Sequence, residues 1–327
     1  MTASMWYQQS PEMAPPALRI CVIGAGAMGG LYAALFAEAG HDVLALDVWQ
    51  EHVDQINSVG LKVTGASGER IVEGVRASSD PLDAANRDLY IVATKGHGVE
   101  SAAQALADVM PAEALVLTIQ NGLGASERLS QYLPMDNVLI GVAEGFGASV
   151  AGPGVLHHSA MKLVRLGEID GGMTDRLKNL EQLWQGAGFN VQAFADIQQL
   201  IWEKFVCNVA LSGPCALFDC SIGELHDNDD SREVSRGCLL EAYEVGQREG
   251  IAFSFTDPVD YLDKFVALMP ASKPSLQQDV AARRPSEIDA INGMVPVLGK
   301  KHGVPTPYNT TVSALVRSLE SRYSSRS

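Results

Sequence analysis

The chain has 327 residues, 46% of them hydrophobic, which is enough for two domains of ordinary size with buried cores. Its 39 acidic and 24 basic residues give a formal net charge of −15, and the longest basic run is Arg283-Arg284. Clusters of Lys and Arg bind phosphate backbones and anionic lipids, so this composition argues against a nucleic-acid or membrane partner. Five cysteines, an odd number without C-x-x-C spacing, indicate a reduced, cytoplasmic chain without a metal site.

The first 17 residues contain a Pro-Pro pair and no apolar core, so they resemble neither a signal peptide nor a membrane span. We expect a flexible extension over 1–17 and a flexible tail over 324–327.

Residues 19–47, RICVIGAGAMGGLYAALFAEAGHDVLALD, predict a strand, a glycine-rich turn, a helix ending at Gly40 and a second strand. The turn has the pattern G-x-G-x-x-G. Its first glycine permits a tight turn, the second lets the backbone approach a pyrophosphate, and the third allows close helix–strand packing. The helix N-terminus adds N–H donors for phosphate. The segment therefore predicts a dinucleotide site formed by Gly24, Ala25, Gly26, Ala27, Met28 and Gly29.

Asp47 ends the second strand, where a carboxylate can accept both hydroxyls of an adenosine ribose. The 2′-phosphate of NADP would place a second negative charge against it. No Lys or Arg stands between Val48 and Glu51 to offset this, and His52 is a poor substitute. We therefore expect NAD as the preferred cofactor and NADP as the alternative. Another interpretation of Asp47 is a cap of the following helix.

Further apolar runs alternate with helical stretches, which is typical of a parallel, doubly wound sheet. The runs are 89–93, 114–119 and 138–142, and the helical stretches are 99–110 and 125–133. Ligands of such sheets bind beyond the carboxyl ends of the strands. Thr94-Lys95-Gly96 and Gln120-Asn121-Gly122 should therefore border the cofactor.

From Gly145 to Phe194, glycines and short β-like pieces predict an antiparallel extension of the sheet. These pieces are 155–157, 162–166 and 191–194.

After residue 195 the pattern becomes helical. Asp196 and Gln199 have the spacing of a capping box, and almost no strand pattern follows as far as Tyr323. The sequence therefore predicts an α/β protein, with an N-terminal Rossmann-type doubly wound sheet followed by an all-α C-terminal domain. We expect an NAD(P)-binding domain over 18–195 and a helical domain for substrate binding and dimerisation over 196–327.

The first helix after Asp196 carries polar residues that could do chemistry. Lys204 and Asn208 are four residues apart and share one face, and Ser212 lies one turn further along it. One interpretation is a proton donor with substrate contacts. The other is a lysine that extends to solvent and a capping asparagine.

Four blocks, in this order, make the chain similar to the ketopantoate reductase family. They are Gly24-Ala-Gly-Ala-Met-Gly29, Gln120-Asn121-Gly122-Leu123-Gly124, Lys204-x-x-x-Asn208, and Ser275-x-x-x-Asp279 with Glu287 inside Arg283-Arg-Pro-Ser-Glu-Ile-Asp-Ala-Ile-Asn-Gly293. Members of that family reduce a 2-oxo acid to a 2-hydroxy acid with a nicotinamide cofactor. They combine a Rossmann domain with a helical domain.

The resemblance implies a role for each matching residue. Lys204 would be the general acid, and Glu287 would accept a hydrogen bond from a substrate hydroxyl beside the cofactor. Asn121 would contact the nicotinamide end and the substrate, and Asn208 the substrate. Ser275 would contact the substrate carboxylate. Lys95 would line the cofactor site, although a solvated loop lysine fits its position nearly as well. His157 matches a family position for which we expect a structural role at a strand edge.

Three positions depart from the family pattern. Ser212 and Ser272 stand where the family has substrate-contacting asparagines, and Asp47 stands where it mostly has a basic residue and uses NADPH. A serine side chain is shorter and cannot donate and accept bidentately as an amide can. Because Lys204 and Glu287 are kept, the resemblance still implies an oxidoreductase of 2-oxo/2-hydroxy acids, with 2-dehydropantoate as the first named substrate.

Two alternatives stay open. One is an NAD-dependent D-2-hydroxyacid dehydrogenase with a different substrate, and the other is a catalytically inactive dinucleotide-binding sensor. Apolar stretches in the helical part, such as Phe265–Met269, favour a homodimer.

Overall fold

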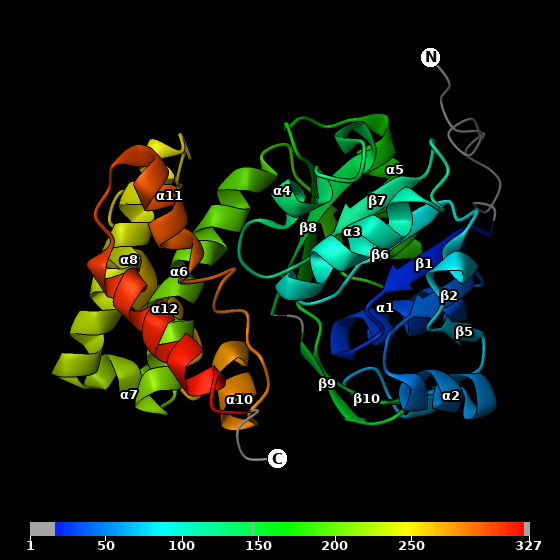
Figure 1. Ribbon diagram of the computed structural model, residues 1–327, viewed down its shortest axis with the longest axis horizontal. Helices are drawn as coiled ribbons and strands as arrows, with labels where there is room; N and C mark the ends of the chain where they lie inside the picture. Colours follow the sequence, from blue (N-terminus) through cyan, green and yellow to red (C-terminus); the bar gives the residue numbers. More distant parts are fainter. Residues whose placement is uncertain (1–16, 146, 324–327) are drawn as a thin grey trace. The chain divides into compact units, whose positions relative to one another are not determined.

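The computed structural model describes residues 17–145 and 147–323 (Figure 1). Of the flexible ends expected over 1–17 and 324–327, residues 1–16 and 324–327 lie outside the described residues. The chain divides into two compact units. The α/β unit comprises Met1–Gln120 and Ala125–Ile197, and the helical unit comprises Asn121–Gly124 and Gln198–Ser327. The expected α/β and all-α fold classes are confirmed.

The α/β unit is built on an eight-stranded sheet with the order β12-β11-β8-β7-β6-β1-β2-β5. Its strands are β1 (Arg19–Ile23), β2 (Asp42–Leu46), β5 (Val75–Ser78), β6 (Leu89–Val92), β7 (Leu115–Thr118), β8 (Val138–Glu144), β11 (Leu163–Glu168) and β12 (Val191–Ala193). In the part of the sheet with the order β8-β7-β6-β1-β2-β5, all neighbouring strands pair in parallel. Strands β8 and β11 pair antiparallel, and β11 and β12 pair in parallel. The predicted antiparallel extension is therefore right for β11 and wrong for β12.

Helices cover both faces of this sheet. They are α1 (Ala27–Glu38), α2 (Gln50–Val59), α3 (Val99–Ala107), α4 (Ala125–Leu129) and α5 (Asp175–Gly186), with short 3₁₀ turns η2 (Pro81–Ala84), η3 (Gly96–Gly98) and η4 (Met135–Asn137). Successive residues of β1 point to opposite faces. Ile20 and Val22 belong to the core beneath α1 and α5, whereas Cys21 and Ile23 belong to the core beneath α3.

A second sheet of four strands, with the order β4-β3-β10-β9, packs on α1. Its strands are β3 (Leu61–Gly65), β4 (Arg70–Val72), β9 (Gly147–Gly152) and β10 (Val155–Ala160). The expectation that 155–157 extends the main sheet is wrong, because β10 pairs with β3 and β9. His157 therefore lies on an interior strand rather than at an edge. Its Nδ1 lies 3.1 Å from Thr64 Oγ1.

The helical unit consists of seven helices in the described part of the chain. They are α6 (Ile197–Phe218), α7 (Ile222–Asp227), α8 (Asp229–Arg248), α9 (Pro258–Leu268), α10 (Ser275–Ala281), α11 (Met294–His302) and α12 (Pro307–Glu320). Helix α8 packs against α7, α9, α11 and α12. The largely buried helix α6 supplies much of the core, including Phe205, Val206 and Val209.

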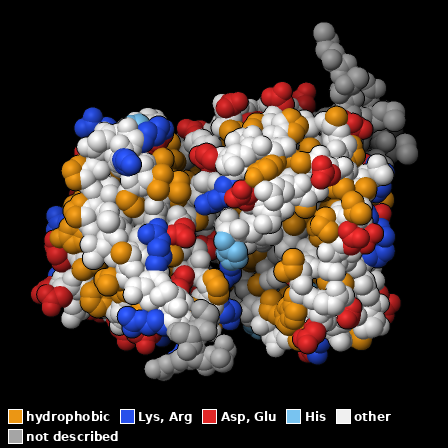
Figure 2. Space-filling model, viewed as in Figure 1, with side chains coloured by type: hydrophobic (Ala, Val, Ile, Leu, Met, Phe, Trp, Pro, Cys, Tyr) orange, Lys and Arg blue, Asp and Glu red, His pale blue; other side chains and the backbone are white. Residues whose placement is uncertain are grey.

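The short segment Asn121–Gly124 belongs by its contacts to the helical unit, although the sequence boundary near residue 195 placed it in the first domain. None of the helices in the described part of the chain combines the length and apolar character that a bilayer-spanning helix requires. On the face shown in Figure 2, Lys and Arg side chains are interspersed with Asp and Glu.

Candidate active site

The glycine-rich turn between β1 and α1 meets three different steric conditions. Gly24 has φ +87°, and a Cβ there would lie 2.8 Å from Thr94 Cα. A Cβ on Gly29 would lie 1.9 Å from the Gly24 carbonyl oxygen, whereas a Cβ on Gly26 would have no atom within 4 Å. The first glycine thus allows the turn, the third allows α1 to pack on the turn, and the second borders open space. That this space takes a pyrophosphate stays a prediction.

Helix α1 begins at Ala27, and Gly26 is its N-cap residue. Its first turn contains no acidic residue, so the partial positive charge of the helix N-terminus is not neutralised there. Ala27 and Met28 are half-buried in this first turn, and Ala25 is fully buried beneath it. These features fit the diphosphate of a dinucleotide.

Asp47 follows β2 and is half-buried. Its Oδ1 accepts a hydrogen bond from the Trp49 N–H at 3.0 Å, and Oδ2 makes no hydrogen bond to the described residues. Helix α2 begins at Gln50, and its N-cap residue is Trp49. Asp47 therefore stabilises the turn that precedes α2 and is not itself the capping residue. His52 is completely buried, which leaves it no access to a phosphate beside Asp47.

Gln120 joins the carboxyl ends of β6 and β7; the sequence predicted that it borders the cofactor but assigned it no role of its own. Its Nε2 donates to the Val92 carbonyl oxygen at 2.6 Å and to that of Thr94 at 3.3 Å. Lys95 is half-buried beside this junction and is the N-cap residue of η3. The signal for Gln120 is its place in the block that precedes Asn121.

In the helical unit, Asn121 joins Lys204 to Glu287. Lys204 Nζ donates to Asn121 Oδ1 at 2.8 Å, and Asn121 Nδ2 lies 3.4 Å from Glu287 Oε2. Lys204 is half-buried on α6 beside the buried Phe205. The interpretation of Lys204 as a solvent-directed lysine is therefore wrong. The amide is oriented from both sides, because its nitrogen faces a carboxylate and its oxygen faces an ammonium.

Backbone contacts bring Asn121 to this position. Gly122 has φ +81°, and a Cβ there would lie 2.1 Å from the Ala290 carbonyl oxygen. The Leu123 N–H donates to the same carbonyl at 2.9 Å. Glu287 opens the turn that leads to Ala290, since its carbonyl accepts the Ala290 N–H at 3.0 Å. A glycine is therefore required at 122, because any side chain would separate the two segments.

The remaining predicted substrate residues differ in exposure. Asn208 is half-buried and Ser212 is buried on α6, one and two turns beyond Lys204. Ser272 is exposed, and its carbonyl accepts the Ile222 N–H at 3.0 Å. Ser275 is exposed as the first residue of α10. Neither exposed serine hydroxyl is hydrogen-bonded to Lys204, Asn121 or Glu287 in the described structure.

Asn292 anchors the Glu287 segment to α6, a role that the sequence did not reveal. It is completely buried, and its Nδ2 donates to the Val209 carbonyl at 2.8 Å and to Asn309 Oδ1 at 2.9 Å. Pro214 stands inside α6 and supplies no N–H to the helix. The signal available in the sequence was the position of Asn292 five residues after Glu287.

The thiols of the chain are poor nucleophiles. Cys21 and Cys207 are buried, and burial raises the pKa of each to about 12. Such thiols stay protonated at neutral pH, in keeping with their expected role as small core residues.

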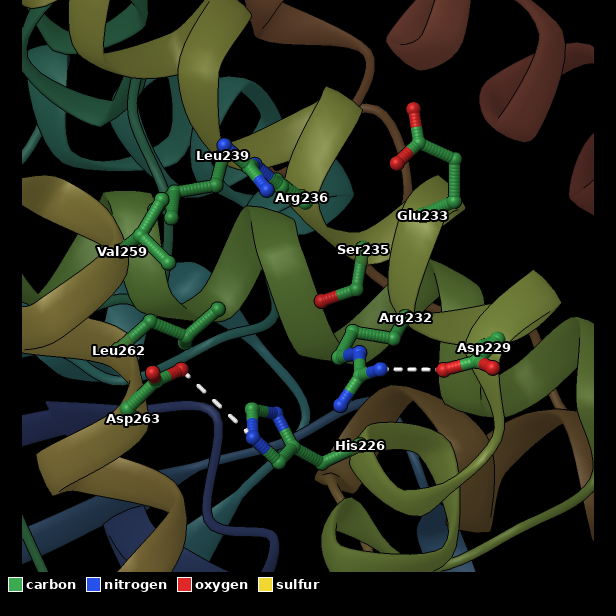
Figure 3. Close-up of a pocket in the computed structure, with 10 residues that line it drawn as sticks. All are labelled: His226, Asp229, Arg232, Glu233, Ser235, Arg236, Leu239, Val259, Leu262 and Asp263. Carbon is green, nitrogen blue, oxygen red and sulfur yellow. Dashed lines mark hydrogen bonds and ion pairs between the residues drawn. The ribbon is translucent and has the colours of Figure 1, made fainter.

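A cavity of about 440 Å³ in the helical unit lies apart from these residues, at the end of α7 between α8 and α9 (Figure 3). Its charged side chains are largely paired with one another. Arg232 forms an ion pair with Asp229, and His226 Nε2 lies 3.6 Å from Asp263 Oδ1. Leu262 lies on its apolar side. The candidate active site does not use this cavity.

Comparison with protein families matches both parts of the chain. The family described as "Ketopantoate reductase PanE/ApbA" matches residues 20–171, and "Ketopantoate reductase PanE/ApbA C terminal" matches residues 196–320. A 2-dehydropantoate 2-reductase of Streptococcus pyogenes serotype M6 is 31% identical over 302 residues. The match covers 92% of this chain and 97% of that protein.

Solved structures are similar over nearly the whole length. A PanE/ApbA family ketopantoate reductase from Ralstonia eutropha JMP134 has a TM-score of 0.85 at 29% identity, covering 93% of this chain and 99% of that one. D-mandelate dehydrogenase, in a ternary structure with NADH and anilino(oxo)acetate, has a TM-score of 0.84 at 27% identity. That match covers 93% of this chain and 99% of the dehydrogenase.

Proposed function

Because the chain belongs to the ketopantoate reductase family, we propose that it transfers hydride between a nicotinamide cofactor and a 2-oxo/2-hydroxy acid. We propose 2-dehydropantoate as its first substrate. The observation that supports this most directly is the hydrogen-bonded group Lys204–Asn121–Glu287, which holds an ammonium in a defined position.

Lys204 acts as the general acid in this proposal. When bound, the nicotinamide supplies the hydride. Reduction of a carbonyl places negative charge on its oxygen, and a positioned ammonium stabilises that charge and then gives up a proton from Nζ. An ammonium has three N–H donors, so Nζ can contact Asn121 and a carbonyl oxygen at once. Asn121 limits the motion of Nζ, because Glu287 fixes the orientation of the amide.

The substrate contacts belong to the same unit as Lys204. Glu287 can accept a hydrogen bond from a substrate hydroxyl, and Asn208 and Ser212 extend the polar face of α6. Ser275, with Ser272, is proposed to contact the substrate carboxylate. Serines at 212 and 272 offer less hydrogen bonding than the asparagines expected from the family, so the substrate is open to variation at these two points.

A second candidate is an NAD-dependent D-2-hydroxyacid dehydrogenase. It is supported by the similarity to D-mandelate dehydrogenase, which was solved with NADH, and by Asp47. The carboxylate of Asp47 has one oxygen held by Trp49 and a second that can accept ribose hydroxyls. With His52 buried, no basic side chain between Val48 and His52 is available for a 2′-phosphate. We propose NAD as the preferred cofactor and NADP as the alternative. The cofactor would be bound by the glycine-rich turn of residues 24–29, called the glycine loop below, and by Asp47 and Lys95.

We further propose that the protein works in the cytoplasm as a homodimer, without a nucleic-acid or membrane partner. The odd set of unpaired cysteines and the apolar stretches of the helical unit support this.

The test of the proposed function is a substrate panel followed at the absorbance band of reduced nicotinamide. Purified protein is mixed with NADH or NADPH and with 2-dehydropantoate, 2-oxo-2-phenylacetate or pyruvate. Oxidation with 2-dehydropantoate supports the first proposal, and a strong preference for 2-oxo-2-phenylacetate with NADH supports the second. A protein that binds NADH but oxidises it with none of these acids would instead be a dinucleotide-binding sensor.

A further inference from the structure

His52 is a completely buried imidazole that joins three segments of the α/β unit. It projects from the first turn of α2. Its Nε2 lies 3.0 Å from the carbonyl oxygen of Ala25 in the glycine loop. Its Nδ1 accepts the N–H of Gly154, in the turn between β9 and β10, at 2.9 Å. Neither the composition nor the family blocks pointed to this residue.

The hydrogen bonds define the protonation state of the ring. A backbone N–H can only donate, so Nδ1 of His52 carries the lone pair that accepts from Gly154. The ring proton then resides on Nε2 and is donated to the Ala25 carbonyl oxygen. The Trp49 ring stacks on the imidazole with centroids 5.1 Å apart and planes 8° apart. His52 is therefore a neutral, oriented donor to the glycine loop.

The Ala25 carbonyl is enclosed from a second direction as well. A Cβ added to Gly30 would lie 2.8 Å from the same oxygen. The backbone of α1 therefore packs closely against the Ala25 carbonyl. In a planar trans peptide, the C=O of one residue and the N–H of the next point in opposite directions. Because His52 holds the Ala25 C=O on the buried side, the Gly26 N–H is directed away from that side. Gly26 borders the open space of the loop.

We propose that His52 is a positioning residue for dinucleotide binding, which presets the Ala25–Gly26 peptide so that its N–H is available to the pyrophosphate before the cofactor arrives. The inference rests on the proposed function, because it assumes that the loop binds a dinucleotide. It adds a residue that acts on the loop from beneath and has no contact with the ligand.

The same short segment also holds Asp47. The Trp49 N–H donates to Asp47 Oδ1, and the Trp49 ring covers His52. Residues 47–52 thus connect the carboxylate proposed for the ribose with the carbonyl that orients the phosphate loop. The start of α2 serves both ends of the adenosine diphosphate moiety.

Two amide substitutions separate the two hydrogen bonds of His52. The side-chain nitrogen of glutamine reaches about as far as Nε2, so His52→Gln can still donate to Ala25. The side-chain oxygen of asparagine lies about where Nδ1 does, so His52→Asn can accept from Gly154 but does not reach Ala25. The matched control is His157→Asn, on the other sheet. The probes are ADP-ribose, which has the pyrophosphate but no nicotinamide, and NADH, both measured by titration calorimetry, with thermal unfolding of the unliganded variants.

We expect His52→Asn to weaken ADP-ribose and NADH binding by about tenfold or more, the equivalent of one lost buried hydrogen bond. His52→Gln should stay within about threefold of the wild type, and His157→Asn should not change either affinity. Equal affinities for His52→Asn and wild type overturn the inference. The inference is also overturned if His52→Asn and His52→Gln lose the same affinity for both probes and their Tm falls by the same amount. In that case the residue is structural only. If the wild type binds neither NADH nor NADPH, the proposed function fails together with the inference; wild-type binding with unaffected variants removes the inference alone.

Discussion

At the scale of single residues, the orientation of Asn121 decides what Lys204 can do. An amide can present either its oxygen or its nitrogen to a neighbour. Here the nitrogen is directed to Glu287 and the oxygen to Lys204 Nζ. A lysine with a free four-carbon side chain would lose more rotamer entropy on meeting a substrate than one already held in place. The contact with Asn121 would therefore lower the entropic cost of the proton transfer that we propose for Lys204.

Replacement of this lysine should remove the proton donor. We expect Lys204→Ala to lower kcat by about 10²-fold or more, the usual effect of losing a positioned acid, with a modest change in the cofactor Kd. Steady-state kinetics of NADH oxidation, with NADH binding measured separately, checks both parts. Lys300→Ala, at an exposed position of α11, is the control and should behave as the wild type. A Lys204→Ala enzyme with wild-type turnover would refute the role.

The charge of Asp47 should set the choice between NADH and NADPH. Two like charges near 4 Å repel by about 4 kcal/mol at an effective dielectric constant near 20, so a 2′-phosphate is disfavoured there. We expect Asp47→Arg to shift the ratio of kcat/KM for NADPH over NADH by at least about tenfold toward NADPH.

Asp47→Asn separates the charge from the hydrogen bond. Its amide oxygen can still accept the Trp49 N–H, so we expect a smaller shift in the same direction. If the wild type already prefers NADPH, the interpretation of Asp47 is wrong.

At the scale of elements, the junction of β1 and α1 places opposite demands on its glycines. Gly29→Ala would put a Cβ 1.9 Å from the Gly24 carbonyl oxygen and should lower the free energy of unfolding by about 1–3 kcal/mol.

Gly26→Ala places its methyl group in open space at φ −61°, so the variant should unfold as the wild type does. It should bind NADH more weakly, because the methyl group occupies the proposed pyrophosphate site. Thermal unfolding and NADH titration of both variants separate the effects. A Gly26→Ala protein with unchanged NADH affinity would remove the pyrophosphate from this site.

Helix α6 and the Glu287 segment are held together by Asn292. Its amide hydrogens satisfy the Val209 carbonyl and Asn309 Oδ1, both in the core of the helical unit. Asn292→Ala leaves these acceptors without their donor, and we expect a loss of about 1–3 kcal/mol for each unpaired group. Chemical denaturation measures the loss. Asn179→Ala, in helix α5 of the other unit, is the control, and equal stability of the two variants would contradict the anchoring role.

At the scale of the whole molecule, the sequence predicted those features that have local causes. Apolar runs and glycine-led turns predicted β1, β2, β6, β7 and β8, because strand burial and turn geometry leave periodic, short-range patterns. The second sheet was missed because β3 contains only two large apolar residues, Leu61 and Val63, and β4 only three residues. In addition, the pattern of β10 does not reveal its partner. Pairing of β10 with β3 joins segments that are distant in the sequence.

The candidate site shows the same division. The glycine loop is local and was predicted from its residues. Lys204 and Asn121 are 83 residues apart, and Asn121 and Glu287 are 166 apart, so only the family resemblance connected them. His52 acts on the backbone carbonyl of Ala25, and Asn292 acts in part on that of Val209, groups that every residue possesses. No side-chain pattern in the sequence could have indicated those partners.

Stability of the whole molecule should fall in acid, because several carboxylates are held ionised by basic partners. Burial of Glu168 raises its pKa, but hydrogen bonds from Arg176 and Thr174 outweigh this and keep the pKa below its usual value of 4.5. Asp42, Asp88 and Glu249 have pKa values lowered in the same way by basic neighbours that outweigh burial. A carboxyl whose pKa is lower in the folded state stabilises the fold above its unfolded pKa, and the contribution is lost as pH falls through the folded pKa.

Glu168 should contribute most to this acid sensitivity, since its side chain is only 6% exposed. The net charge of −15 opposes the trend at first, because mild acid relieves repulsion among the excess carboxylates. Below about pH 4.5, however, protonation removes the acceptors themselves, and we expect Tm to fall steeply. Glu168→Gln should destabilise the protein by about 3 kcal/mol at neutral pH, because Arg176 loses the carboxylate with which it forms an ion pair, and should reduce the fall in Tm between about pH 6 and about pH 3.5. The exposed Glu69, paired with Lys62, is the control, and Glu69→Gln should change neither quantity. A Glu168→Gln protein whose Tm declines with pH as steeply as that of the wild type would show that acid unfolding begins at other carboxylates.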